Sequence, residues 1–132
     1  MRRLDRNMIV AGQILPQQVA ELAASGVTRI INNRPEHEEP GQPTGDSIEG
    51  AAKAAGVDYV AIPIAGGISD AAVETMAGAL GGEGMMLAFC RSGTRSTYLW
   101  AMAKSRLGSP ATELTEQAAA AGYDLSPIAR FL

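Results

Sequence analysis

The sequence contains one cysteine, Cys90, and one histidine, His37, among its 132 residues. A single cysteine cannot form a disulfide within the chain, which excludes a disulfide-rich secreted scaffold and makes a reducing, cytoplasmic location the expected one. One cysteine and one histidine also cannot supply the three or four ligands of a zinc site. We therefore expect neither a metal nor another cofactor.

The chain also lacks long apolar runs and an excess of positive charge. No stretch approaches the roughly 18 consecutive apolar residues of a membrane span. The basic start, which includes Arg2 and Arg3, is followed by no apolar segment of the kind found in a signal peptide. Eleven Lys and Arg against 14 Asp and Glu give a net charge of −3, too acidic for a protein that neutralises nucleic-acid phosphates. We expect no membrane and no nucleic-acid partner, and the oligomeric state stays open.

What is present fits a single globular domain over residues 1–132. Apolar residues make up 46% and charged residues 19% of the chain, which excludes a disordered protein. Strand-like runs are expected at 29–32, 58–64 and 85–89, and a loop at 33–46. Helices are expected at 16–26, from Ser47 to Gly56, from Ser69 to Gly81, at 96–107 and from Pro110. This alternation predicts a three-layer α/β fold, a mostly parallel sheet flanked by helices.

The most informative segment follows the run 85–89 and reads CRSGTRS, from Cys90 to Ser96. Ligands of open α/β sheets bind beyond the carboxyl ends of the strands, where the loop N–H groups and the next helix N-terminus would hold an anion. Arg95 offers that anion a bidentate guanidinium. The same field would lower the pKa of Cys90 from about 8.5 and make it a nucleophilic thiolate. A lone cysteine is more often a packing residue, but two arginines and a glycine within five positions favour catalysis.

Cys90 and Arg95 are therefore the candidate catalytic residues. The loop residues expected to bind the substrate are Arg91, Ser92, Gly93, Thr94 and Ser96.

The segment from Cys90 to Arg95 looks like the active-site loop of cysteine phosphatases and rhodaneses. The wider chain resembles a bacterial family with a phosphatase-like fold, the domain of unknown function 442, also described as beta-lactamase-hydrolase-like or as a sulfur transferase family. The residues that carry this resemblance outside the loop are Gly12-Gln13, Gly26, Asn33-Arg34-Pro35 with Glu38, and Pro63. The resemblance covers nearly all of the chain and implies a cysteine-phosphatase-like fold.

The spacing in the loop bears on the activity. Protein tyrosine phosphatases have five residues between cysteine and arginine, whereas four lie between Cys90 and Arg95, which is similar to rhodaneses. Phosphatases of this group also use an aspartate as general acid. No aspartate lies in the loop directly after Ile64, and Asp70 is better explained as a first-turn residue of a helix. Both features favour sulfur transfer over phosphate hydrolysis.

A second candidate region is the loop from Asn33 to Glu38, which should open at the same edge of the sheet. Arg34 would add charge for an anionic donor, and Glu38 would orient Arg34 or Arg95. His37 suggests a cysteine–histidine pair, but the acidic residues around it point to a solvent-facing position. We therefore do not expect His37 to be catalytic.

Three functions follow from these residues. In the first, a rhodanese-like sulfurtransferase, Cys90 takes the outer sulfur of thiosulfate or a persulfide, a small sulfur-containing anion, and passes it to a thiophilic acceptor. A separate persulfide-oxidising enzyme would then be a partner. The second function is a cysteine phosphatase with Cys90 as nucleophile. The third is a non-catalytic module that binds anions or senses oxidants through its thiol.

Overall fold

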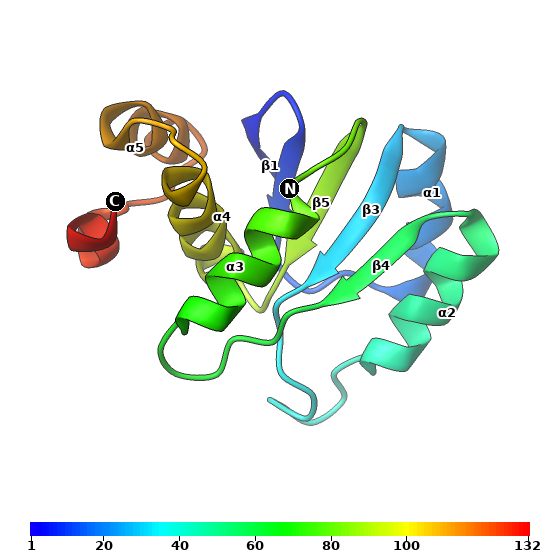
Figure 1. Ribbon diagram of the computed structural model, residues 1–132. Helices are drawn as coiled ribbons and strands as arrows, with labels where there is room; N and C mark the ends of the chain where they lie inside the picture. Colours follow the sequence, from blue (N-terminus) through cyan, green and yellow to red (C-terminus); the bar gives the residue numbers. More distant parts are fainter.

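A five-stranded sheet lies between two layers of helices in the computed structural model, which describes residues 1–132 (Figure 1). The strands are β1 (Arg2–Asp5), β2 (Met8–Ala11), β3 (Val27–Asn32), β4 (Asp58–Ala61) and β5 (Met85–Phe89). Their order is β1-β2-β5-β3-β4. Only β1 and β2 pair antiparallel, and the other pairs are parallel. The predicted three-layer, mostly parallel α/β fold is confirmed.

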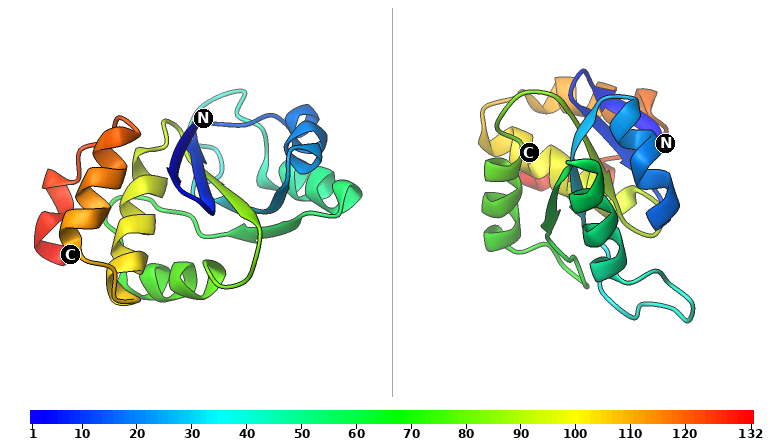
Figure 2. Two further views of the ribbon diagram at one scale, coloured as in Figure 1. Left: turned by 90° about the horizontal axis from the view of Figure 1, so that it is seen from above. Right: turned by 90° about the vertical axis from the view of Figure 1, so that its right-hand side faces the viewer.

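The helices divide between the two faces of the sheet (Figure 2). One face packs against α1 (Val19–Ala24) and α2 (Gly45–Ala55), and the short 3₁₀ helix η1 (Pro16–Gln18) contacts these two helices. The other face packs against α3 (Asp70–Ala79), α4 (Thr94–Arg106), α5 (Ala111–Ala120) and the terminal 3₁₀ helix η2 (Ser126–Phe131). None of these helices combines the length and the hydropathy that crossing a bilayer requires.

The central strand β5 explains why the run 85–89 is apolar without interruption. Side chains alternate along a strand, so Met86 and Ala88 join the core on the α3–α5 side while Leu87 and Phe89 join the core on the α1–α2 side. A strand that is covered on both faces has no position left for a polar side chain. Cys90 follows directly and is also fully buried.

Two helices begin earlier than the sequence suggested. Helix α2 is capped by Thr44 rather than Ser47, and the Thr44 hydroxyl accepts a hydrogen bond from the Ser47 N–H at 3.1 Å. Helix α4 begins at Thr94 rather than Ser96, immediately after Gly93, whose φ of 90° ends the preceding loop. The first turn of α4 therefore contains Arg95 itself.

The strands differ from the prediction at the edges of the sheet. β4 ends at Ala61 rather than at Ile64, although the N–H groups of Ile62 and Ile64 still donate to the carbonyls of Asn32 and Asn33 at 2.8 and 2.9 Å. Two strands were not among those predicted: the short β2, and the edge strand β1, whose sequence, Arg-Arg-Leu-Asp, has only one residue that the core buries.

Candidate active site

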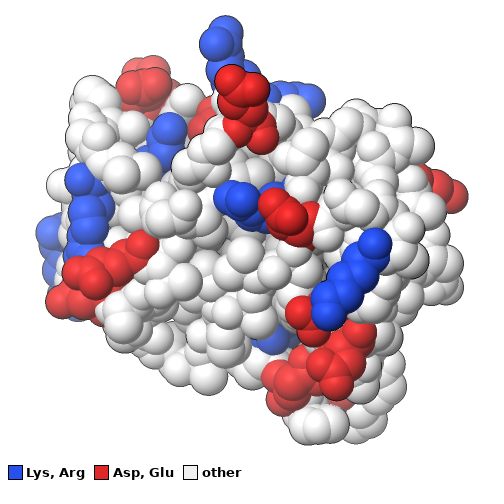
Figure 3. All heavy atoms as spheres, turned by 45° about the vertical axis from the view of Figure 1, so that its right-hand side comes forward, with Lys and Arg blue, Asp and Glu red and all other residues white.

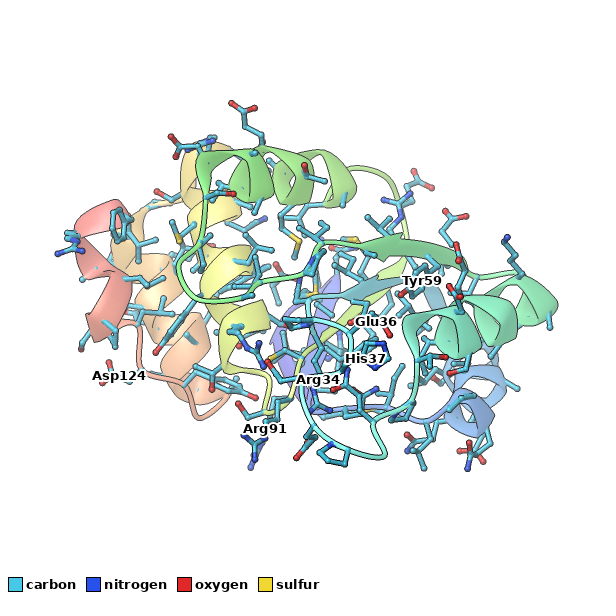
Figure 4. The ribbon with its side chains drawn as sticks, turned by 90° about the horizontal axis from the view of Figure 1, so that it is seen from below. Arg34, Glu36, His37, Tyr59, Arg91 and Asp124 are labelled. Atoms are coloured by element: carbon cyan, nitrogen blue, oxygen red, sulfur yellow. The ribbon has the colours of Figure 1, made fainter.

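The parallel strands bring four loops to one edge of the sheet, which Figure 4 shows from below. The loop after β5 starts at Cys90, and the loops after β2, β3 and β4 lie around it. The backbone of Gly12, after β2, lies close to the backbone of the loop after β5, so that an added Cβ atom at Gly12 would lie 2.9 Å from the carbonyl oxygen of Arg91. A side chain at position 12 would push the loop away, so glycine is required there.

The Cys90 sulfur accepts hydrogen bonds from backbone N–H groups of its own loop. The Cys90 N–H donates to the Ala11 carbonyl at 3.3 Å, and the Gly93 N–H donates to Sγ at 3.1 Å. Burial raises the pKa of the Cys90 thiol, but hydrogen bonds from the backbone of Ser96, Ser92 and Gly93 lower it by more, so the net shift is downward. Hydrogen bonds from backbone N–H groups to a buried sulfur favour the thiolate over the neutral thiol.

Arg95 lies beside this cradle and is fixed by a carboxylate. Its two terminal nitrogens donate to the two oxygens of Glu38 at 2.7 and 2.8 Å, and Nη1 also donates to the Ile64 carbonyl at 2.9 Å. The Arg95 and Glu38 side chains are 25% and 26% exposed. The predicted orienting contact between Glu38 and Arg95 is present, with the bidentate geometry typical of arginine and a carboxylate.

Arg34 is a second, buried arginine that binds the Glu38 carboxylate. Its side chain is only 2% exposed, and its Nε donates to Glu38 at 2.9 Å. Nη1 donates to Gln13 at 3.0 Å, while Nη2 pairs with Glu39. Arg95 first, and then Arg34, hold the pKa of Glu38 down at about 2 against the opposing effect of burial. Glu38 is therefore ionised at neutral pH and joins the two arginines.

Asn33 and Ser96 connect the site to the strands through buried side-chain hydrogen bonds. The Ser96 hydroxyl donates to the Asn33 side-chain oxygen at 2.7 Å, and the Asn33 amide donates to the Ile62 carbonyl at 2.9 Å. Both residues are fully buried. These hydrogen bonds connect the first turn of α4 to the ends of β3 and β4. Ser96 therefore contributes a structural contact through its side chain as well as a backbone hydrogen bond to Cys90.

The remaining predicted residues lie at the rim or outside it. Arg91 projects outward from the loop, with its side chain 66% exposed and 3.7 Å from Glu39 (Figure 4). Thr94 accepts a hydrogen bond from the Ser92 hydroxyl at 3.1 Å. His37 is exposed, has a φ of 57° and makes no side-chain hydrogen bond. Asp70 follows the N-cap Ser69, as predicted, and its side chain is 92% exposed and pairs with Arg106.

A cavity of about 400 Å³ opens beside Arg95. Its walls come from the loop after β4, from α4 and from η2, and most of its residues are apolar. On the face of the molecule in Figure 3, basic side chains lie next to acidic ones.

The geometry agrees with the comparisons to known proteins. A family model described as the phosphatase-like domain of beta-lactamase hydrolase-like protein matches residues 1–107. The chain belongs to this family. A beta-lactamase hydrolase-like protein from Agrobacterium fabrum is 33% identical over 98% of this chain, and one from Xylella fastidiosa is 36% identical over 79% of it. The chain spans 31% and 25% of the lengths of these two relatives.

Solved structures share the cysteine-phosphatase-like fold of this chain. A candidate phosphatase from Neisseria meningitidis is 32% identical, with a TM-score of 0.83 over 98% of this chain and 93% of that one. The Pseudomonas aeruginosa protein TpbA, solved with phosphotyrosine, shares the fold at 18% identity, with a TM-score of 0.62 over 87% of this chain and 68% of its own. These relatives support an enzyme with a cysteine-phosphatase-like fold. They favour the phosphatase alternative and give no support to the predicted sulfurtransferase.

Three residues of this chain that touch the site were not singled out from the sequence. Gln13 accepts from Arg34, Glu39 pairs with both Arg34 and Arg91, and the Tyr123 hydroxyl donates to the Ser92 carbonyl at 3.2 Å. Gln13 had appeared only as part of the family resemblance. Tyr123 lies 33 positions after Cys90 in an Ala-rich region, and no local pattern connects the two.

Proposed function

We propose that the domain hydrolyses phosphate monoesters through a phosphocysteine at Cys90. The observation that carries the proposal is the convergence of N–H groups on the Cys90 sulfur, with Arg95 beside them. Such a cradle binds an oxyanion and stabilises the charge that spreads over a phosphoryl group in its transition state. The family and the solved relatives point in the same direction.

The reaction would run in two steps. The Cys90 thiolate attacks phosphorus, the S–P bond forms, and the P–O bond to the leaving group breaks with its electron pair on that oxygen. A water molecule then attacks phosphorus, the S–P bond breaks, and inorganic phosphate and the thiolate are released. Throughout, the loop N–H groups and Arg95 hold the non-bridging oxygens.

The carboxyl groups near the cradle do not provide a proton for the leaving group. Glu38 has a pKa of about 2 and is held by two arginines, and the pKa of Glu39 is also lowered, chiefly by its hydrogen bond from Arg34. Asp70 lies on the surface with Arg106. General acids contribute typically about 10²–10⁴-fold, so turnover should be slow except for leaving groups that are stable as anions. We therefore propose aryl phosphates as better substrates than alkyl phosphates.

The test is phosphate release from a series of aryl phosphates with graded leaving-group pKa values. The wild type should show rates that fall steeply as the leaving-group pKa rises. Cys90→Ser should show no turnover, and Arg95→Lys should lose most of it, because lysine keeps the charge but loses the bidentate fork. Arg106→Lys, on the last turn of the same helix, is the matched control and should keep wild-type rates. Turnover in a folded Cys90→Ser protein would refute the mechanism.

The length of the loop favours a second candidate, sulfur transfer. Four residues between Cys90 and Arg95 make a small ring of N–H donors, which suits a persulfide sulfur. The thiolate would attack the outer sulfur of thiosulfate, the S–S bond would break, and sulfite would leave as a stable anion that needs no acid. A mass spectrum after thiosulfate treatment decides: a gain of one sulfur on Cys90 supports this candidate, and an unchanged mass rejects it.

A further inference from the structure

We propose that Tyr123 is a positioning residue that aims the Ser92–Gly93 peptide group at the Cys90 thiolate. This role rests on the proposed function only in that it concerns the same cradle. Tyr123 lies outside residues 1–107, the part that matches the family model. The role would therefore be contributed by the C-terminal part of the chain, from the connection between α5 and η2.

The argument starts from the geometry of one peptide unit. The Ser92 carbonyl and the Gly93 N–H belong to the same planar trans peptide, so they point in opposite directions. The carbonyl accepts a hydrogen bond from the Tyr123 hydroxyl at 3.2 Å, and the N–H donates to the Cys90 sulfur at 3.1 Å. A contact that fixes the carbonyl also fixes the direction of the N–H.

Packing leaves this peptide little room to rotate. Gly93 has a φ of 90°, and an added Cβ atom there would lie 2.2 Å from the Tyr123 oxygen. The phenol therefore lies directly against the glycine. Tyr123 is fixed in turn by its own N–H, which donates to the Ala118 carbonyl at the end of α5 at 2.8 Å. The loop is thus held between the thiolate on one side and the end of α5 on the other.

The hydroxyl remains a donor while the thiol ionises. Burial, and then the negative charge of Cys90, raise the pKa of Tyr123, while Arg2 acts in the opposite direction. The other charged group that faces Cys90 is Arg95 on α4, whose charge is shared with Glu38. The phenol is therefore neutral over the pH range in which the cradle would work, and its hydroxyl can keep donating its hydrogen bond to the Ser92 carbonyl.

The test is the pH dependence of Cys90 alkylation by iodoacetamide, which requires the thiolate but no turnover. Tyr123→Phe removes only the hydroxyl, and the alkylation midpoint should rise by about 0.5–1 pH unit, the equivalent of one ordinary hydrogen bond. Affinity for orthovanadate should fall by about 3- to 10-fold over the same energy range. Tyr98→Phe is the matched control, because Tyr98 is on α4 and its hydroxyl makes no hydrogen bond within the protein. Its midpoint should equal that of the wild type.

A second variant changes the hydroxyl in the opposite direction. A 3-fluorotyrosine at position 123 keeps the ring and makes its hydroxyl a stronger donor, so the midpoint should fall below that of the wild type. Unchanged midpoints in Tyr123→Phe and in the fluorinated protein, with thermal unfolding like that of the wild type, would overturn the proposal. Because alkylation is independent of hydrolysis, a domain that hydrolyses no phosphate ester would leave this result readable.

Discussion

At the scale of single residues, the site depends on groups that hold one charge state. The Cys90 thiol is buried, yet N–H donors favour its anion, and the Glu38 carboxyl is held ionised by two guanidinium groups. Neither group is stabilised by a single strong contact. Each depends on several fixed neighbours, which is why a conservative change at one neighbour should be measurable.

Alkylation of Cys90 should show a midpoint below about 8.5, the pKa of a free thiol. Its pKa is lowered in the folded state, so the rate of alkylation should rise with pH through a midpoint lower than that of the unfolded chain. Arg95→Ala removes the cation beside the sulfur and should raise the midpoint. Iodoacetamide kinetics from about pH 5 to pH 10 measure both. A wild-type midpoint at the value of a denatured control would show that Cys90 is only a packing residue.

Glu38 should give the fold an acid-sensitive contribution. Its folded pKa of about 2 is lower than the ordinary value, so its stabilisation is complete above about pH 4.5 and is lost as the pH falls toward 2. Since the Glu38 side chain is 26% exposed, solvent screening reduces the contribution to about 1 kcal/mol. Urea unfolding at several pH values should show a flatter acid limb in Glu38→Gln. The exposed Glu74, which pairs with Arg106, is the control: Glu74→Gln should keep the wild-type slope.

At the scale of elements, the site is built where α4 begins. Gly93 ends the loop in the left-handed region and leads into the helix, and the Thr97 N–H and hydroxyl both donate to its carbonyl, at 3.0 and 2.8 Å. Helix N-termini attract anions through their free N–H groups. The single glycine therefore sets both the start of the helix and the orientation of the cradle.

Gly93→Ala should damage both stability and anion binding. The left-handed φ is unfavourable for alanine, and the new methyl group would meet the Tyr123 hydroxyl, so we expect a loss of about 1–3 kcal/mol. Gly78→Ala is the control, because Gly78 lies within α3 with no atom near its Cβ position, and it should gain up to about 1 kcal/mol. Chemical unfolding and vanadate binding measure the two effects. A Gly93→Ala protein as stable as the wild type would contradict the strained geometry.

How far the sequence predicts these elements depends on the kind of signal. The apolar run at β5 and the caps at Ser69 and Pro110 are local, and the structure has them where they were predicted. The early start of α4 was missed because Gly93 looked like part of a loop, whereas its backbone caps the helix. Within the site, Glu38 was expected to orient Arg34 or Arg95 because the loop after β3 opens at the same edge of the sheet as the loop after β5, and it contacts both arginines. Tyr123 could not be predicted, because it reaches the loop only through the packing of α5.

At the scale of the whole molecule, the core extends past the region that defines the family. The family model matches residues 1–107, but Leu114, Ala118, Leu125 and Ile128 are buried in the same cluster as the central strands. The last part of the chain therefore covers one face of the sheet. It also carries Tyr123 and one wall of the cavity beside Arg95.

Leu114→Ala should destabilise the whole fold. The side chain is fully buried on α5, and Leu→Ala changes in cores cost about 2–5 kcal/mol. Leu107 is 59% exposed just after α4, and Leu107→Ala should change the free energy of unfolding by no more than about 0.5 kcal/mol. Urea unfolding monitored by circular dichroism compares the two variants. Equal, small effects would mean that α5 is only loosely attached to the sheet.

The position of β5 has a consequence for motion. Its amide and carbonyl groups are paired with β2 on one side and β3 on the other, whereas the edge strand β4 pairs with β3 alone. Amide protons of β5 should therefore exchange with deuterated solvent only when the entire protein opens, while those of β4 exchange through local fraying. Cys90 directly follows β5. On the slow timescale of exchange, Cys90 should therefore keep its place until the whole fold opens, even while the edge of the sheet frays.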